Sequence, residues 1–150
     1  MPARRGAAAV LALGLLTGGC VAHPVGPART FGKYKGKAVT TATSALSSVE
    51  TVRLASDTAY KSFGPYTASV VSDAEEAVTK VEGTFDSIQP PNDRADALHD
   101  ELSRLLTDAA DHVRAVRVAA RRGELNELAE KAAPLRDDAA RLRDFTERNK

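Results

Sequence analysis

The sequence contains few of the residues on which catalysis and covalent cross-linking depend. Cysteine occurs once among 150 residues, so the chain can form no internal disulfide. No serine stands in a nucleophile elbow, and no His-Glu-x-x-His motif is present. Aromatic residues are limited to four phenylalanines and three tyrosines. We therefore expect no catalytic residues, no enzyme activity and no cofactor.

Histidine is also scarce, with only three residues in the chain. His99 follows Asp96 by three positions and His112 follows Asp108 by four, so each pair could reach one ligand from the flank of a helix. A di-iron helical bundle draws such pairs from two helices, whereas both of these belong to one predicted helix. We expect ordinary helix-flank histidines and no metal site.

The apolar run near the N-terminus is too short to cross a membrane permanently. It covers residues 7–16, whereas a transmembrane helix needs about 20 apolar residues. Arg4 and Arg5 precede it, and small residues follow it immediately before Cys20. A positive start, a short apolar run and a small-residue end are typical of a secretory signal peptide, which is removed from the mature protein.

Residues 1–20 resemble the lipobox signal peptide of bacterial lipoproteins. Cys20 occupies the position of the cysteine that is acylated in that family, although Thr17 stands where the usual pattern has leucine. The resemblance implies removal of residues 1–19, a diacylglyceryl thioether on Cys20 and a location on the extracytoplasmic face of the cell membrane. Two or three acyl chains would form a stable anchor. The alternative is a cleaved signal peptide followed by an unmodified thiol.

Charge is unevenly distributed along the chain, although the net charge is only +1. Residues 21–37 carry four basic and no acidic side chains, and they also contain several prolines and glycines. We interpret residues 20–37 as a flexible basic tether, which either contacts an anionic bilayer or serves only as a solvated spacer. In residues 38–150, basic side chains alternate with a larger number of acidic ones. This pattern predicts no basic patch of the kind that nucleic-acid binding requires, so we expect no nucleic-acid partner.

From Val39 onward, apolar residues recur at steps of three and four, which predicts helices. Gly64-Pro65, Pro90-Pro91 and Gly123 interrupt this period and mark corners. Pro134 lies inside the last segment without changing its apolar register, so we expect one bent helix there. The predicted helices cover residues 39–63, 66–88, 93–122 and 125–145.

Four helices of similar length joined by short corners predict an all-α fold, an antiparallel up-down four-helix bundle over residues 38–150. The alternative is an extended pair of helical hairpins that closes only on a partner. Alanine-rich seams predict close helix packing around a modest core. In the closed bundle, the corners at Gly64-Pro65 and Gly123 share the end opposite the tether.

Aromatic and arginine side chains gather at this end of the predicted bundle. Such residues are common in protein-binding surfaces. Their alternative roles are to cap the core, for the aromatics, and to offset the helix dipole, for the arginines. We predict a partner-binding tip formed by Tyr60, Phe63, Tyr66, Arg121 and Arg122.

Together, these features favour a membrane-anchored lipoprotein of the bacterial cell envelope. Its helical bundle would bind another envelope protein, as an adaptor does, or space envelope components. The alternative function is a small-ligand carrier or sensor with a pocket between the helices. In that case Leu102 and Leu135 would contribute to ligand binding, whereas the adaptor hypothesis assigns binding to the tip.

Overall fold

The protein is a bundle of helices in the computed structural model, which describes residues 28–62 and 64–150. No strand is present among these residues, and the all-α prediction is confirmed. The predicted signal peptide, Cys20 and Phe63 lie outside the described residues. None of the described helices is long and apolar enough to cross a membrane. Four helices pack against one another, namely α1 (Phe31–Asp57), α2 (Gly64–Asp86), α3 (Asp93–Arg122) and α5 (Leu135–Arg148).

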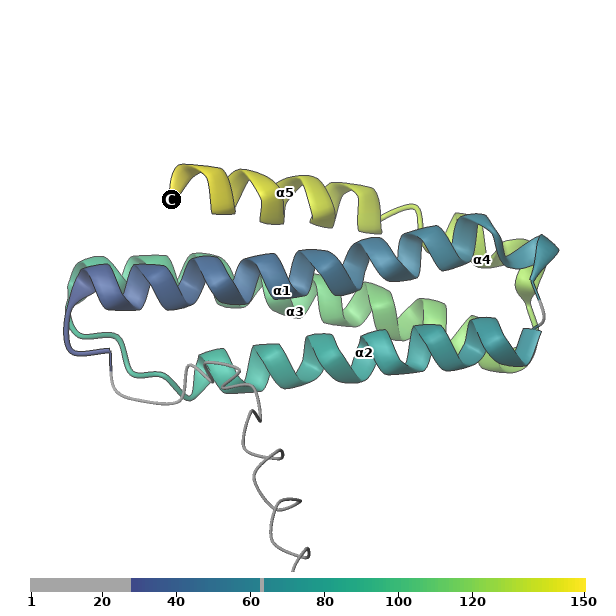
Figure 1. Cartoon of the computed structure of the whole chain (residues 1–150), viewed down its shortest axis with the longest axis horizontal. Helices are drawn as coiled ribbons and strands as arrows, with labels where there is room; N and C mark the ends of the chain where they lie inside the picture. The colour runs from purple at the N-terminus through teal and green to yellow at the C-terminus, as the bar shows by residue number, and fades with distance from the viewer. Residues whose placement is uncertain (1–27, 63) are drawn as a thin grey trace, which may run out of the picture.

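Successive long helices run in opposite directions, as Figure 1 shows. The start of α1, the connection from α2 to α3 and the C-terminus share one end, called here the proximal end. Lys35 donates a hydrogen bond to the carbonyl oxygen of Lys150 across it, at 3.2 Å. The opposite, distal end holds three short pieces that connect the long helices: η1 (Ala59–Lys61), η2 (Leu125–Glu127) and α4 (Leu128–Lys131).

The core is built from one buried row of small and medium side chains on each helix. On α3 this row recurs at steps of three and four, with Leu106 fully buried and Leu105 only partly buried. The largest side chains in the core are Tyr34, Phe85 and Phe145. Because most of the row on α1 is alanine and valine, its neighbours can approach closely.

The first helix begins earlier than the sequence predicts. It starts at Phe31, so residues 31–37 of the predicted flexible tether belong to the bundle. The Thr30 side chain caps this start by accepting a hydrogen bond from the Lys33 backbone N–H at 3.3 Å. Tyr34 is fully buried and extends the apolar row of α1 toward its start. Its burial outweighs the low helix propensity of Gly32 and Gly36, which costs about 1 kcal/mol each.

The end of α1 also differs from the prediction. The helix stops at Asp57 instead of continuing to residue 63. The Thr58 hydroxyl donates to the Leu54 carbonyl oxygen at 2.9 Å, and the tight turn η1 follows. Serine and threonine hydroxyls make the same bond inside α1, as Thr51 does to Ser47, so this bond alone does not set the end of the helix.

The fourth predicted helix is broken instead of bent. Residues 132–134 form a turn between α4 and α5. Pro134 has no N–H to donate to the preceding helical turn, and Leu135 instead donates to the Ala132 carbonyl oxygen at 3.0 Å. The fourth position of the bundle is therefore filled mainly by the 14 residues of α5.

Both predicted ends of α3 are confirmed. The Asn92 side chain accepts a hydrogen bond from the Ala95 N–H at 3.1 Å, and acidic residues occupy the first turn. Gly123 ends the helix with a left-handed φ of 75°, while Arg121 and Arg122 occupy its last turn.

Candidate functional site

The distal end presents two exposed tyrosines. Tyr60 lies on η1 and Tyr66 on the first turn of α2, and each is 66% exposed. The Lys61 ammonium lies 5.0 Å from the centroid of the Tyr60 ring, a cation–π arrangement. A bundle that places both rings so openly is not using them to cap its core.

Four of the five predicted tip residues lie at the distal end. Arg121 and Arg122, in the last turn of α3, are both exposed and lie at the same end as Tyr60 and Tyr66. Phe63 lies outside the described residues. Below, the name distal tip denotes Tyr60, Tyr66, Arg121 and Arg122.

The loops beneath the distal tip pack closely. The turns η1 and η2 contact each other. A Cβ atom added to Gly64 would lie 3.3 Å from Cδ1 of Leu125, so glycine lets the start of α2 approach η2. The tip therefore rests on packed turns.

A second surface feature was not predicted. A groove of about 720 Å³ runs between α2 and α3 and reaches the distal end at Arg121. We call it the arginine groove, and it is lined by Ser72, Glu75, Glu76, Thr79, Lys80, Arg114, Arg117 and Arg121. Detecting it requires the register of α2 against α3, which the separate helix patterns do not provide.

The arginines of this groove have few carboxylate partners. Glu75 Oε1 lies 3.6 Å from Nε of Arg114 and 3.7 Å from Nε of Arg117, so it pairs with both at long range. Arg114 has a closer partner in Asp111, at 2.7 Å. Nε of Arg117 is buried and has no hydrogen-bond partner among the described residues.

Two further, smaller grooves lie on the surface of the described residues. One, of about 480 Å³, lies beside the end of α3 and is lined in part by Arg122, Val118 and Lys131. The other, of about 410 Å³, is lined by Asp86, His99, Asp100, Ser103 and Arg104. Leu102 and Leu135, the residues of the alternative carrier hypothesis, are fully buried and line none of these three grooves.

His112 contacts a different carboxylate from the one its spacing suggested. Its Nδ1 donates to Oδ2 of Asp138 on α5, at 2.6 Å. Arg141 donates to the other oxygen of Asp138 at 2.8 Å and to Asp108 at 3.2 Å. Asp138 is only 2% exposed, so these two donors satisfy a carboxylate inside the α3–α5 contact. The network positions α5 on the bundle.

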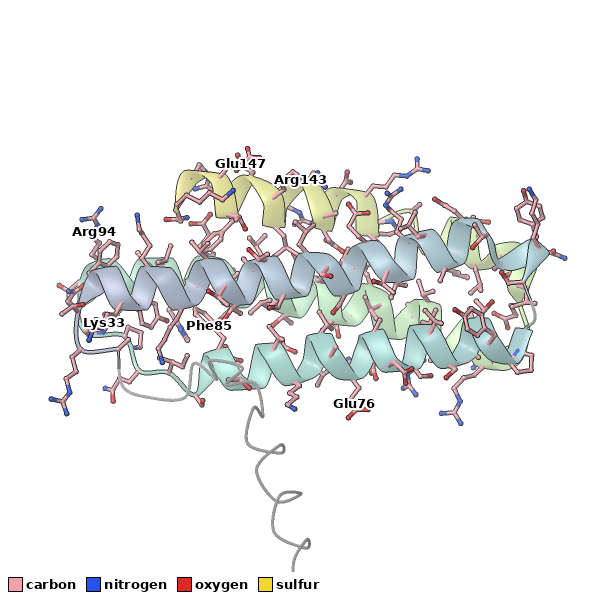
Figure 2. The ribbon with its side chains drawn as sticks, viewed as in Figure 1. Lys33, Glu76, Phe85, Arg94, Arg143 and Glu147 are labelled. Atoms are coloured by element: carbon pink, nitrogen blue, oxygen red, sulfur yellow. The ribbon has the colours of Figure 1, made fainter. Side chains whose placement is uncertain are left out.

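His99 belongs to an aromatic cluster at the proximal end. Its Nδ1 lies 2.7 Å from the Tyr34 hydroxyl, and its ring stacks on Phe85 with centroids 5.1 Å apart. Figure 2 shows Phe85 reaching from α2 toward α1. Burial, followed by the nearby carboxylates of Asp96 and Asp86 and a weaker effect of Asp100, raises the pKa of Tyr34 to about 12. The tyrosine hydroxyl therefore keeps its proton to higher pH than an exposed tyrosine does, and it shares a hydrogen bond with His99.

Among the described residues, no group of three or more histidine, cysteine, aspartate or glutamate side chains is arranged to hold a metal ion. The His112–Asp138 pair has the hydrogen bond that orients a general base, but no nucleophilic side chain from residues 28–62 or 64–150 is bonded to it. The described geometry therefore offers surfaces for binding more clearly than groups for chemistry.

Comparison with known proteins gives no family assignment. No protein-family model, curated protein or solved structure matches this chain.

Proposed function

We propose that the protein is a lipid-anchored, extracytoplasmic adaptor whose distal tip binds another protein of the bacterial cell envelope. The observation that carries this proposal is the exposure of Tyr60 and Tyr66 at the same end of the bundle as the exposed Arg121 and Arg122. Tyrosine and arginine are enriched where protein surfaces bind partners, because each combines a large contact area with hydrogen-bonding groups.

The position of the tip fits an anchored adaptor. Cys20, the predicted acylation site, precedes the start of α1 by 11 positions, and α1 begins at the proximal end. A helix of 27 residues is about 40 Å long, so the tip lies about that far from the start of α1. An anchor near one end and a binding surface at the other would present the tip to proteins away from the bilayer.

Cross-linking in intact cells tests the proposal. The wild-type protein, Tyr66→Ala and Arg121→Glu would each be cross-linked, purified and compared by mass spectrometry. We expect both variants to lose a partner that the wild type captures, while circular dichroism shows an unchanged helical content. Neither side chain is buried, so neither substitution should open the core.

The matched control is Glu147→Lys, a charge reversal at an exposed position on α5 away from the tip, as Figure 2 shows. It should retain the partner. If Tyr66→Ala and Arg121→Glu both recover the same partner as the wild type, the distal tip is not the binding surface.

A further inference from the structure

The arginine groove has a linear arrangement of positive charge. Arg114, Arg117 and Arg121 follow one another at steps of three and four, so they project from the same side of α3. From Arg114 to Arg121 the helix rises about 10 Å, which is longer than a single carboxylate or phosphate group. The spacing suits a ligand that carries several anionic groups along its length.

The groove is short of negative charge. It is lined by four basic side chains and only two acidic ones. Of the two, Glu76 is exposed and points outward from α2, as Figure 2 shows, and it forms no ion pair within the described part of the chain. Glu75 pairs with Arg114 and Arg117 at distances beyond a normal hydrogen bond. Asp111 is the closer carboxylate partner of Arg114, so the long-range pair with Glu75 is the one ion pair that Arg117 forms within the described residues.

Two of the three arginines lack a close acceptor. Arg117 has a buried Nε without a hydrogen-bond partner, and Arg121 forms no ion pair with any described residue. Glu75 Oε1 lies 3.7 Å from Nε of Arg117, so this pair is a long-range one. A guanidinium group binds carboxylates with particular strength because its donors match the two oxygens.

We propose that the arginine groove binds an acidic peptide segment, rich in glutamate or aspartate, of the partner protein. This deepens the proposed function, on which it rests, because it gives the chemistry of the partner at a surface that meets the distal tip at Arg121. A protein segment is favoured over other polyanions because the exposed Tyr66 ring, in the first turn of α2, lies at the same end of the bundle as Arg121 in the last turn of α3. Aromatic and arginine side chains together are typical of protein interfaces.

Fluorescence anisotropy with a labelled hexaglutamate peptide and the full-length protein tests the groove directly. We expect the wild type to bind the peptide and Arg117→Gln and Arg121→Gln to weaken binding by about tenfold each. The matched control on the same helix is Arg94→Gln, at the proximal end, which should change affinity by less than about twofold. Circular dichroism of each variant would show that the bundle is intact.

Glu75→Gln should change the affinity for the peptide in the opposite direction from the arginine substitutions. This substitution removes a carboxylate that pairs at long range with both Arg114 and Arg117, while Asp111 keeps its pair with Arg114, so we expect peptide binding to tighten by about threefold. If Arg117 were only a structural partner of Glu75, the substitution would not improve binding.

Three results would overturn the proposal. They are no binding of the peptide to the wild type, equal binding to Arg117→Gln and Arg121→Gln, and binding of inorganic polyphosphate without binding of hexaglutamate. Because the peptide is a defined probe, these results are independent of the cellular cross-linking. A partner that depends on Tyr66 while the peptide fails to bind would refute the groove and leave the distal tip in place.

Discussion

Tyr34 is the residue that fixes where the bundle begins. It is fully buried, it packs against Phe85 with ring centroids 5.8 Å apart, and it bonds to His99. This contact joins α1 to α2 and α3 at the proximal end. A lysine- and glycine-rich segment that would otherwise be a linker is thereby incorporated into a helix, since most helical stability in proteins comes from tertiary packing.

The buried hydroxyl of Tyr34 predicts a pH-dependent contribution to stability. The pKa is about 12 in the folded protein against an ordinary value of 10.0, so the folded state holds the proton more tightly. The contribution of Tyr34 is therefore complete below pH 10 and is lost as pH rises toward about 12. Below pH 10, we expect Tyr34→Phe to lower the free energy of unfolding by about 1 kcal/mol, because the hydrogen bond to His99 is lost.

Urea unfolding from about pH 8 to about pH 11.5 measures this effect. The difference in the free energy of unfolding between wild type and Tyr34→Phe should narrow as pH increases, because only the wild type has a buried hydroxyl to ionise. Tyr66→Phe controls for the loss of an exposed tyrosine hydroxyl. A gap that stays constant or widens with pH would contradict the assignment.

Several side-chain partners could not be inferred from the sequence. The spacing of His112 pointed to Asp108, four residues away on the same helix, whereas the structure pairs His112 with Asp138 on α5. The sequence also did not indicate that Arg117 has few hydrogen-bond acceptors around it. Contacts between side chains far apart in the sequence depend on the register of one helix against another, and apolar periodicity specifies only which face each helix buries.

At the level of the helices, local signals predicted boundaries well where they were strong. Asn92 and Gly123 act through their own backbone and neighbouring N–H groups, so both ends of α3 were predictable. The ends of α1 and the break at Pro134 were not. Their positions depend on how burial, backbone bonding and proline compete, and the sequence period is the same on both sides of each boundary.

Two glycines are expected to respond in opposite ways to replacement by alanine. Gly123 has a φ of 75°, where an L residue is strained, so Gly123→Ala should destabilise the protein by about 1–2 kcal/mol. Gly83 lies inside α2 with open space around its Cα, so Gly83→Ala should stabilise it by about 0.5–1 kcal/mol. Thermal and urea unfolding of both variants would measure these two changes in stability. A stabilising Gly123→Ala would show that α3 does not end in the left-handed conformation described.

At the scale of the whole molecule, the up-down topology explains why the tip residues meet. Tyr60, Tyr66 and Arg121 come from three separate parts of the chain, and alternating helix directions bring them to one end. The class of fold and this grouping were predictable, because short connections allow few other arrangements of consecutive helices. The exposure of each ring was not, since it depends on the packing of η1 against η2.

The central claim is that this bundle is held at the membrane by acylation and carries its binding surface at the far end. The most direct test is the intact mass and membrane fractionation of the native protein, beside Cys20→Ala. We expect a chain that begins at Cys20 with an added lipid mass in the membrane fraction, and loss of both the lipid and the membrane association in the variant. An unmodified chain in the soluble fraction would contradict the claim.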